Sequence, residues 1–297
     1  MAQATVNTLL KVLDESVIKF IDSLPVEQKR IYDKVVDLVS QLDRRNGNIK
    51  INVANQKLLL KISAELDKII LSDSYQRKVA EFSKVFETVS ILNNRYLAAT
   101  FAEFKPFKTL EEIKKVNMAL TIDALTEAKV GVGMKSSIMN VLKANIGSGG
   151  SYGDLIRVLH GEIVEGVKGA SPYMISESQK IVIDAVHQYN AQYIKAVTDD
   201  LGLEWFQYLG SLLTTSRDFC VHMVEKRYFH VSEIPALLRG EIDGKQIPLS
   251  KKGLPVGMYD NTNATNFFIY RGGHKCGHQI IPVPAVVVPK ELRDRFS

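Results

Sequence analysis

Residues 171–202 read SPYMISESQKIVIDAVHQYNAQYIKAVTDDLG and carry the pattern of one long helix. Ser171 can cap the free amides of a first turn, and Pro172 fits that turn. We expect the helix to continue for about 28 residues and to end near Gly202. Its apolar face is predicted to contain Ile175, Val182, Val186, Tyr189, Tyr193 and Val197.

The residues before this helix also carry apolar side chains at intervals of three and four, which predicts a succession of helices. Pro106 and the glycine-rich stretch 147–150 are expected to interrupt them. The repeat over residues 82–96 spans two heptads, so it suits either an intramolecular bundle or a short coiled coil with a partner. The expected helices lie at residues 9–24, 25–42, 59–69, 82–96, 110–129, 136–145 and 151–159.

After Gly202 the sequence pattern changes to short aromatic and β-branched runs separated by prolines and glycines. Runs of this kind at 205–209, 267–270 and 280–283 predict strands in a loop-rich module. The expected fold is mainly α with a C-terminal α+β module, in which an elongated N-terminal helical bundle precedes a compact Cys/His-containing domain. The predicted domains are a helical bundle or arm at 1–130, a second helical part at 131–202, and the loop-rich module at 203–297.

Composition limits the class of protein. Among 297 residues, 45% are hydrophobic and 24% are charged, which is ordinary for a soluble globular protein. We find no apolar run long enough for a membrane span, and the N-terminus lacks the pattern of a secretion signal. The net charge of +5 is not concentrated on one element, so contact with DNA is allowed but not required.

Both cysteines and four of the six histidines lie between residues 220 and 278. Cys220 and His222 are two residues apart, and so are Cys276 and His278. On extended strands, such residues share a face, so the two pairs could close a Cys2His2 tetrahedron around zinc. Cys220, His222, Cys276 and His278 are therefore candidate ligands of a structural zinc ion.

Two other interpretations of this cluster stay open. Cys220 and Cys276 could form a disulfide, although thiols in the cytosol normally stay reduced. The cysteines could also be buried thiols with unrelated histidines nearby. The signatures of zinc proteases and serine hydrolases are missing, and the cluster has no paired acids beyond Asp218 and Glu225. We therefore do not expect an enzyme.

Four short stretches in the second half of the chain combine glycine, aromatic, cysteine and histidine residues. They are GGSYGDLIR at 149–157, YNA at 189–191, GLEWFQYLG at 202–210 followed by TSRDFC at 215–220, and YRGGHKCGH at 270–278 followed by Pro282-Val283. In content and order they resemble the Mu-type minor head, or head-morphogenesis, proteins of tailed bacteriophages over residues 136–284. Two positions depart from that family's pattern. His278 replaces the family's second closing cysteine. The acid that often precedes the family's Thr-Arg pair comes after the arginine here, as Asp218.

The resemblance implies a minor structural protein of the virion, made in the host cytoplasm and packaged in low copy inside the capsid at the portal vertex. It implies assistance in head assembly and in genome packaging or ejection. The implied partners are the portal protein and other head proteins, with non-specific contact to packaged DNA and assembly as an oligomer or low-copy ring. The alternative function is a metal-dependent nuclease or DNA-processing enzyme that uses the C-terminal Cys/His module.

Overall fold

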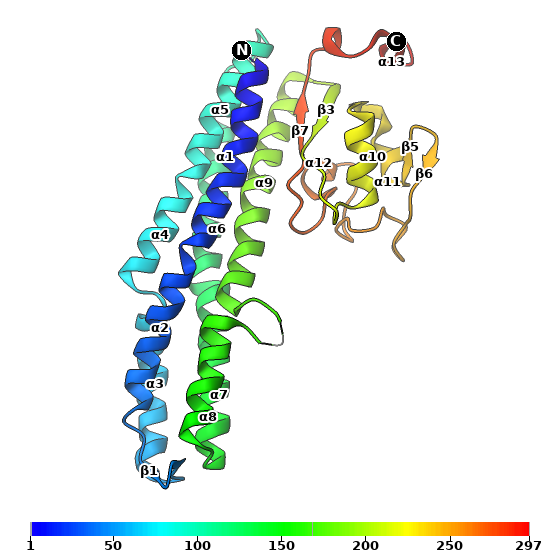
Figure 1. Cartoon of the computed structure of the whole chain (residues 1–297). Coiled ribbons are helices and arrows are strands. Elements are labelled where there is room, and N and C mark those ends of the chain that lie inside the picture. The colour runs from blue at the N-terminus through cyan, green and yellow to red at the C-terminus, as the bar shows by residue number, and fades with distance from the viewer. Residues whose placement is uncertain (1, 168, 297) are drawn as a thin grey trace. The chain divides into compact units, whose positions relative to one another are not determined.

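A computed structural model describes residues 2–167 and 169–296, and most of them lie in helices (Figure 1). The mainly α fold with a small α+β part is therefore confirmed. No helix in the described residues is both long enough and apolar enough to cross a membrane.

The chain forms two compact units, each assembled from segments that are distant in sequence. Helices α1 (Ala2–Asp22), α6 (Lys108–Asp123) and α9 (Tyr173–Leu201) contribute residues to both units. The predicted division at residues 130 and 202 cuts across the units, because apolar helix faces pair with partners far along the chain. Unit 1 comprises Met1–Glu15, Lys84–Met118 and Val182–Ser297, and unit 2 comprises Ser16–Ser83 and Ala119–Ile181.

Unit 2 is a bundle of helices with one small hairpin. Helix α3 packs along α7 and against α2, and one apolar face of it, with Leu59, Ile62, Leu66 and Ile70, is buried. The hairpin pairs β1 with β2 through Asn46 and Gly47, both of which have positive φ. The elements are α2 (Leu24–Val39), β1 (Arg44–Arg45), β2 (Asn48–Ile49), α3 (Val53–Ile70), α4 (Asp73–Ser83), η1 (Ala124–Gly131), α7 (Val132–Ser148), α8 (Tyr152–His160) and η2 (Gly161–Glu165).

The predicted end of a helix near residue 129 is wrong. The π-helical segment η1 leads without a break into α7, so Gly131 and Gly133 lie inside a continuous helical stretch. A Cβ on Gly133 would overlap the Tyr173 side chain, and one on Gly131 would overlap the carbonyl of Thr126. These glycines permit close packing rather than a turn. The helix ends instead at Gly149, whose φ is +67°.

A buried carboxylate connects α2 and α4 in unit 2. Glu27 is 1% exposed, and its Oε1 accepts a hydrogen bond from Ser74 at 2.6 Å. Its Oε2 accepts from Nε of Arg30 at 2.9 Å, and Lys78 lies 3.8 Å from Oε1. Burial alone would raise the pKa of Glu27, but these hydrogen bonds and charges outweigh it and hold the pKa below its ordinary value.

Because the folded state holds the pKa of Glu27 low, its stabilising contribution is present above the unfolded pKa of about 4.3. That contribution is lost as the pH falls through the lower, folded pKa. Glu27→Gln should therefore lower the free energy of unfolding at pH 7 by about 1–3 kcal/mol, with a smaller penalty in acid. Urea denaturation at both pH values measures this. Glu65→Gln, which alters the exposed pair with Lys68, should change little.

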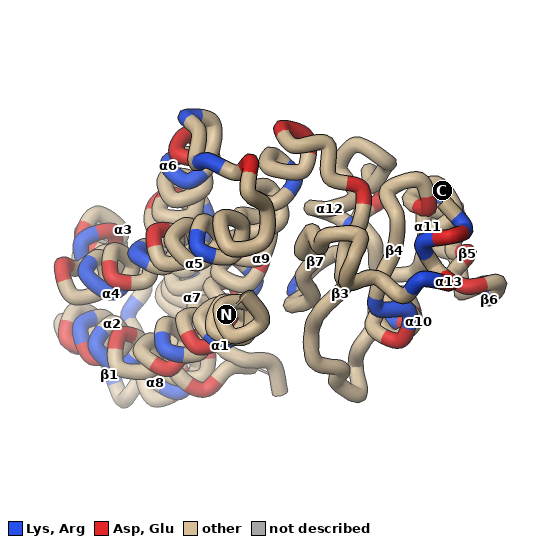
Figure 2. Tube along the Cα trace, turned by 90° about the horizontal axis from the view of Figure 1, so that it is seen from above, with Lys and Arg blue, Asp and Glu red and all other residues tan. Residues whose placement is uncertain are grey.

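Unit 1 contains α5 (Val85–Thr100) and the C-terminal module. The module is built on an antiparallel sheet of order β4-β3-β7. None of these three strands contains Lys, Arg, Asp or Glu, as their tan colour in Figure 2 shows. The other module elements are β3 (Trp205–Leu209), α10 (Asp218–Lys226), β4 (Tyr228–His230), η3 (Val231–Glu233), α11 (Ile234–Leu238), β5 (Glu241–Ile242), β6 (Lys245–Gln246), α12 (Phe267–Tyr270), β7 (Gln279–Pro282), η4 (Ala285–Val287) and α13 (Lys290–Arg293).

The strands predicted at 205–209 and 280–283 are confirmed to within one residue, but the strand predicted at 267–270 is wrong. That run forms the short helix α12, in which Phe267 and Phe268 are both buried in the module core. The aromatic residues gave a β-like pattern because β-propensity mainly reports how well a side chain packs when buried. Here a single helical turn buries both adjacent rings.

Candidate metal centre

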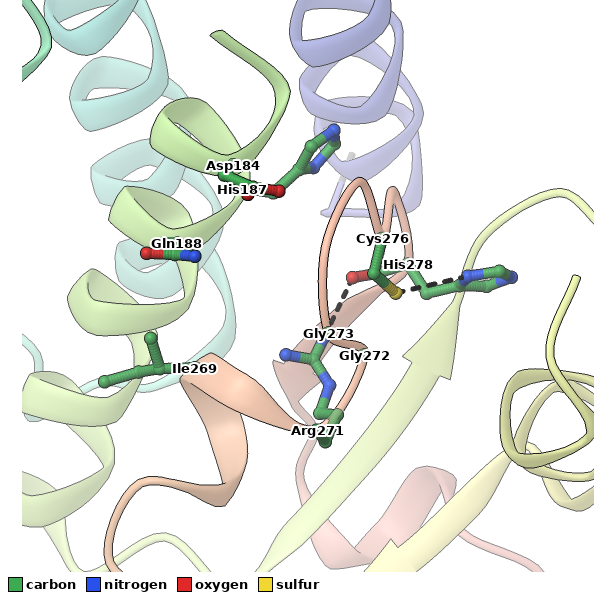
Figure 3. A pocket seen from close by; sticks show the side chains of 9 residues that line it. All are labelled: Asp184, His187, Gln188, Ile269, Arg271, Gly272, Gly273, Cys276 and His278. Atoms are coloured by element: carbon green, nitrogen blue, oxygen red, sulfur yellow. Dashed lines mark hydrogen bonds between the residues drawn. The ribbon is translucent and has the colours of Figure 1, made fainter. Parts of the chain in front are cut away.

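Three potential ligand atoms meet beside the sheet of the C-terminal module. Cys220 lies in the first turn of α10, and its Sγ is 3.9 Å from Sγ of Cys276, in the loop before β7. Nδ1 of His278 is 3.7 Å from Sγ of Cys276 (Figure 3). One donor atom of each residue lies within 4.8 Å of the other two. This group of two thiols and an imidazole could hold a metal ion.

His222 is not part of this group. It lies on α10, where its Nδ1 is 3.4 Å from a carboxylate oxygen of Glu225. The prediction placed Cys220 and His222 on a strand, but successive helical residues are separated by about 100° of rotation, so i and i+2 point in different directions. The other predicted pair, Cys276 and His278, does bring both donors together, from the loop that leads into β7.

The two cysteines are free thiols in the structure. A hydrogen bond from the Cys220 thiol to the Cys276 sulfur lowers the pKa of Cys276 well below its usual value, although burial opposes this. His278 and the positive charge of Arg271 add to the lowering. The same hydrogen bond, together with burial, raises the pKa of Cys220. Cys276 is therefore the sulfur that is prepared to act as a thiolate.

Tyr208 on β3 forms one wall of the cluster. Its hydroxyl donates to Sγ of Cys220 at 3.4 Å, and its ring stacks on His278 with centroids 5.5 Å apart. A Cβ on Gly210 would lie 2.5 Å from Cδ2 of the His278 imidazole. Only glycine leaves room for the ring there, so the imidazole is held between β3 and the loop that follows it.

Arg271 supports the ligand loop from inside. The residue is 4% exposed, and its guanidinium donates to the carbonyl of Phe268 and, at 2.8 Å, to the carbonyl of His278. The guanidinium also lies 5.5 Å from the centre of the Tyr208 ring. Gly272, the next residue, must lack a side chain because its Cβ would overlap the sulfur of Cys276. The loop therefore packs tightly around the candidate ligands.

Asp184 of α9 fixes the outer part of the same loop. Its Oδ1 accepts from the backbone N–H of Lys275 at 2.7 Å, at a residue whose φ is +56°. Its Oδ2 accepts from the Tyr259 hydroxyl at 3.1 Å and lies 3.2 Å from Nδ1 of His274. Asp184 and Tyr259 were not among the predicted site residues, because neither lies near the cysteines in sequence and no local motif marks them.

A chain of buried side chains links this region to the helices of unit 1. Asn93 of α5 donates to Asn190 of α9 at 2.8 Å, and Asn190 donates to Gln279 of β7 at 2.7 Å. Nε2 of Gln279 lies 2.6 Å from Nδ1 of His187. Burial lowers the pKa of His187 to about 4, so this imidazole is neutral at pH 7. Buried polar groups paired in this way specify one arrangement of helix and sheet.

A small cavity lies between α9 and the ligand loop, and its walls include Asp184, His187, Cys276 and His278 (Figure 3). The volume open to the centre of a water molecule is about 10 Å³, which is enough to hold about one water. The candidate metal position therefore adjoins space for a water or a single ion. This cavity is too small for an organic substrate.

Three of the four stretches that suggested a family meet in this region. Asn190 belongs to the stretch 189–191, Tyr208 and Cys220 to the third stretch, and Cys276 and His278 to the last. The stretch 149–157 lies in unit 2 instead, at the turn between α7 and α8. Comparison with known protein families, with curated proteins and with solved structures finds no match for this chain.

Proposed function

We propose that this chain is a minor structural protein of a tailed-phage head, and that zinc bound by Cys220, Cys276 and His278 stabilises its C-terminal module. The observation that carries the proposal is that two family-like stretches meet in one Cys/His cluster, while Asn190 of a third stretch donates to Gln279 beside it. Cys220 is 1% exposed and His278 is 8% exposed. Side chains buried in this way serve to hold a module together rather than to meet a substrate.

The spacing of the donor atoms supports zinc. A tetrahedral zinc ion with bonds of about 2.3 Å to sulfur and 2.0–2.1 Å to nitrogen keeps two sulfurs about 3.8 Å apart. The same geometry keeps sulfur and nitrogen about 3.6 Å apart. The distances here are 3.9 Å between the two sulfurs and 3.7 Å between Cys276 and His278. Thiolate and imidazole donors also favour zinc over magnesium or calcium.

A metal-dependent nuclease is the alternative function, and a three-ligand zinc site does leave one coordination position for water. A nuclease must also admit a phosphodiester group to that position. The adjoining cavity has room for about one water molecule, which favours a structural role. Incubation of plasmid DNA with the protein and zinc, magnesium or manganese tests this directly. We expect no cleavage, and cleavage that is lost in His278→Ala would support the nuclease instead.

The location in the particle is proposed from the sequence resemblance. We infer a place inside the capsid at the portal vertex, in contact with the portal protein and other head proteins. Quantitative mass spectrometry of gradient-purified phage particles tests it. We expect a few to a few tens of copies in each full head, and loss from DNA-emptied heads would identify ejection with the genome. Absence of the chain from both kinds of particle would overturn the proposal.

A further inference from the structure

Two segments that meet at one end of unit 2 contain no acidic residue. Residues 44–64 and 136–153 include six cations but neither Asp nor Glu, whereas the whole chain has 38 Lys and Arg against 33 Asp and Glu. We call this the basic end. Its cations are Arg44, Arg45, Lys50, Lys57, Lys61 and Lys143.

The fold brings the two segments together. The N–H of Ile49 in the hairpin donates to the carbonyl of Gly150 at 3.0 Å, and the N–H of Tyr152 donates to the carbonyl of Gly47 at 3.0 Å. Helix α3 runs antiparallel to α7, because Lys135 near the start of α7 pairs with Asp67 near the end of α3. The hairpin, the start of α3 and the end of α7 therefore share one end of the unit (Figure 1).

The positive charge at this end is not neutralised by neighbouring acids. All six cationic side chains are exposed. None of the six forms an ion pair with any residue in the described part of the chain. Arg44 lies 4.2 Å from the centre of the Tyr152 ring and donates to the carbonyl of Ser40. Three acids border the segments, and each is engaged. Glu65 pairs with Lys68. Asp154 pairs with Arg157, and Asp43 accepts a hydrogen bond from Asn52.

We propose that the basic end of unit 2 binds the phosphate backbone of a DNA duplex without reading its sequence. Lysine and arginine side chains on separate elements can each meet a different phosphate, and asparagine and backbone N–H groups of the hairpin can add hydrogen bonds. This inference does not depend on the phage-head proposal. The sequence does not mark this site with a block of basic residues, because the cations are spread over two segments that are distinguished only by their lack of acids.

An anionic membrane is the other surface that such charge could meet. Val53 and Leu60 on α3 are 70% and 72% exposed, but Lys57 lies between them on the same helix face. A helix that lies on a membrane buries a continuous apolar face, which this lysine interrupts. The arrangement therefore favours nucleic acid over lipid.

Fluorescence anisotropy with a short labelled DNA duplex of arbitrary sequence, titrated at several salt concentrations, tests the proposal. We expect the full-length protein to bind, with affinity falling steeply as salt rises. Neutralising three cations of the basic end should weaken binding and reduce the slope of log K against log salt by about 0.9 per lost contact, or about 3 in total. The variant is Arg45→Gln/Lys50→Gln/Lys57→Gln.

A matched control removes the same charge from the C-terminal module. Lys251→Gln/Lys252→Gln/Lys290→Gln changes three exposed lysines and should leave the affinity and the salt slope unchanged. Equal weakening by both triple variants would mean that only net charge matters, which overturns the proposal. Binding of the protein to vesicles containing phosphatidylserine, without binding to the duplex, would also overturn the proposal. Equal melting temperatures of the three proteins would show that exposed substitutions leave the fold intact.

Discussion

His278→Ala is expected to abolish zinc binding, whereas His222→Ala should leave one zinc per chain. The two histidines are matched in sequence, since each lies two residues after a cysteine, but only His278 contributes a donor to the cluster. Metal analysis of dialysed protein measures the difference. Cys276→Ser should behave like His278→Ala, because a hydroxyl is a much weaker zinc ligand than a thiolate.

Chelation of the zinc should destabilise the C-terminal module more than the rest of the chain. A ligand present at about 1,000 times its dissociation constant adds about 4 kcal/mol to the free energy of unfolding, which chelation removes. Trp205 on β3 is the only tryptophan and is 8% exposed, so its fluorescence reports on this module. Equal unfolding midpoints for wild type with and without zinc would overturn the metal site and leave the phage-head proposal untouched.

The long helix and two of the three expected strands were predictable because their signals are local. Ser171 and Pro172 mark the start of α9, and positive-φ Gly202 marks its end. Aromatic, β-prone content was enough for β3. The same local reasoning failed at Gly131 and Gly133. The carbonyl of Thr126 approaches Gly131 and the side chain of Tyr173 approaches Gly133, and the sequence pattern indicates neither contact.

The candidate site could be predicted only in part. The spacing of Cys276 and His278 was informative because both lie in the loop before β7, but the same spacing misled at Cys220 because that residue lies in a helix. The residues that hold the loop were beyond local reasoning. Asp184 meets Lys275 across 91 positions, and His187 meets Gln279 across 92. Single-sequence patterns carry no signal for contacts over such distances.

Asn190→Ala should lower the free energy of unfolding by roughly 3–5 kcal/mol. Asn190 is fully buried at the centre of the chain of polar side chains that joins α5, α9 and β7. Its removal leaves the Nδ2 group of Asn93 and the Oε1 atom of Gln279 without partners, and each unpaired buried group costs about 1–3 kcal/mol. Loss of the side chain also leaves a small cavity. Urea denaturation followed by circular dichroism and by Trp205 fluorescence measures the change.

Asn140→Ala provides the matched control, because Asn140 is an exposed residue of a helix, α7. Its substitution should change the free energy of unfolding by less than about 0.5 kcal/mol. Because Asn190 connects helices to the sheet, we also expect the fluorescence and circular dichroism transitions of Asn190→Ala to separate, with the C-terminal module unfolding first. A loss below about 1 kcal/mol would contradict the prediction, since it would mean that water replaces the amide and that the polar chain does not couple α9 to β7.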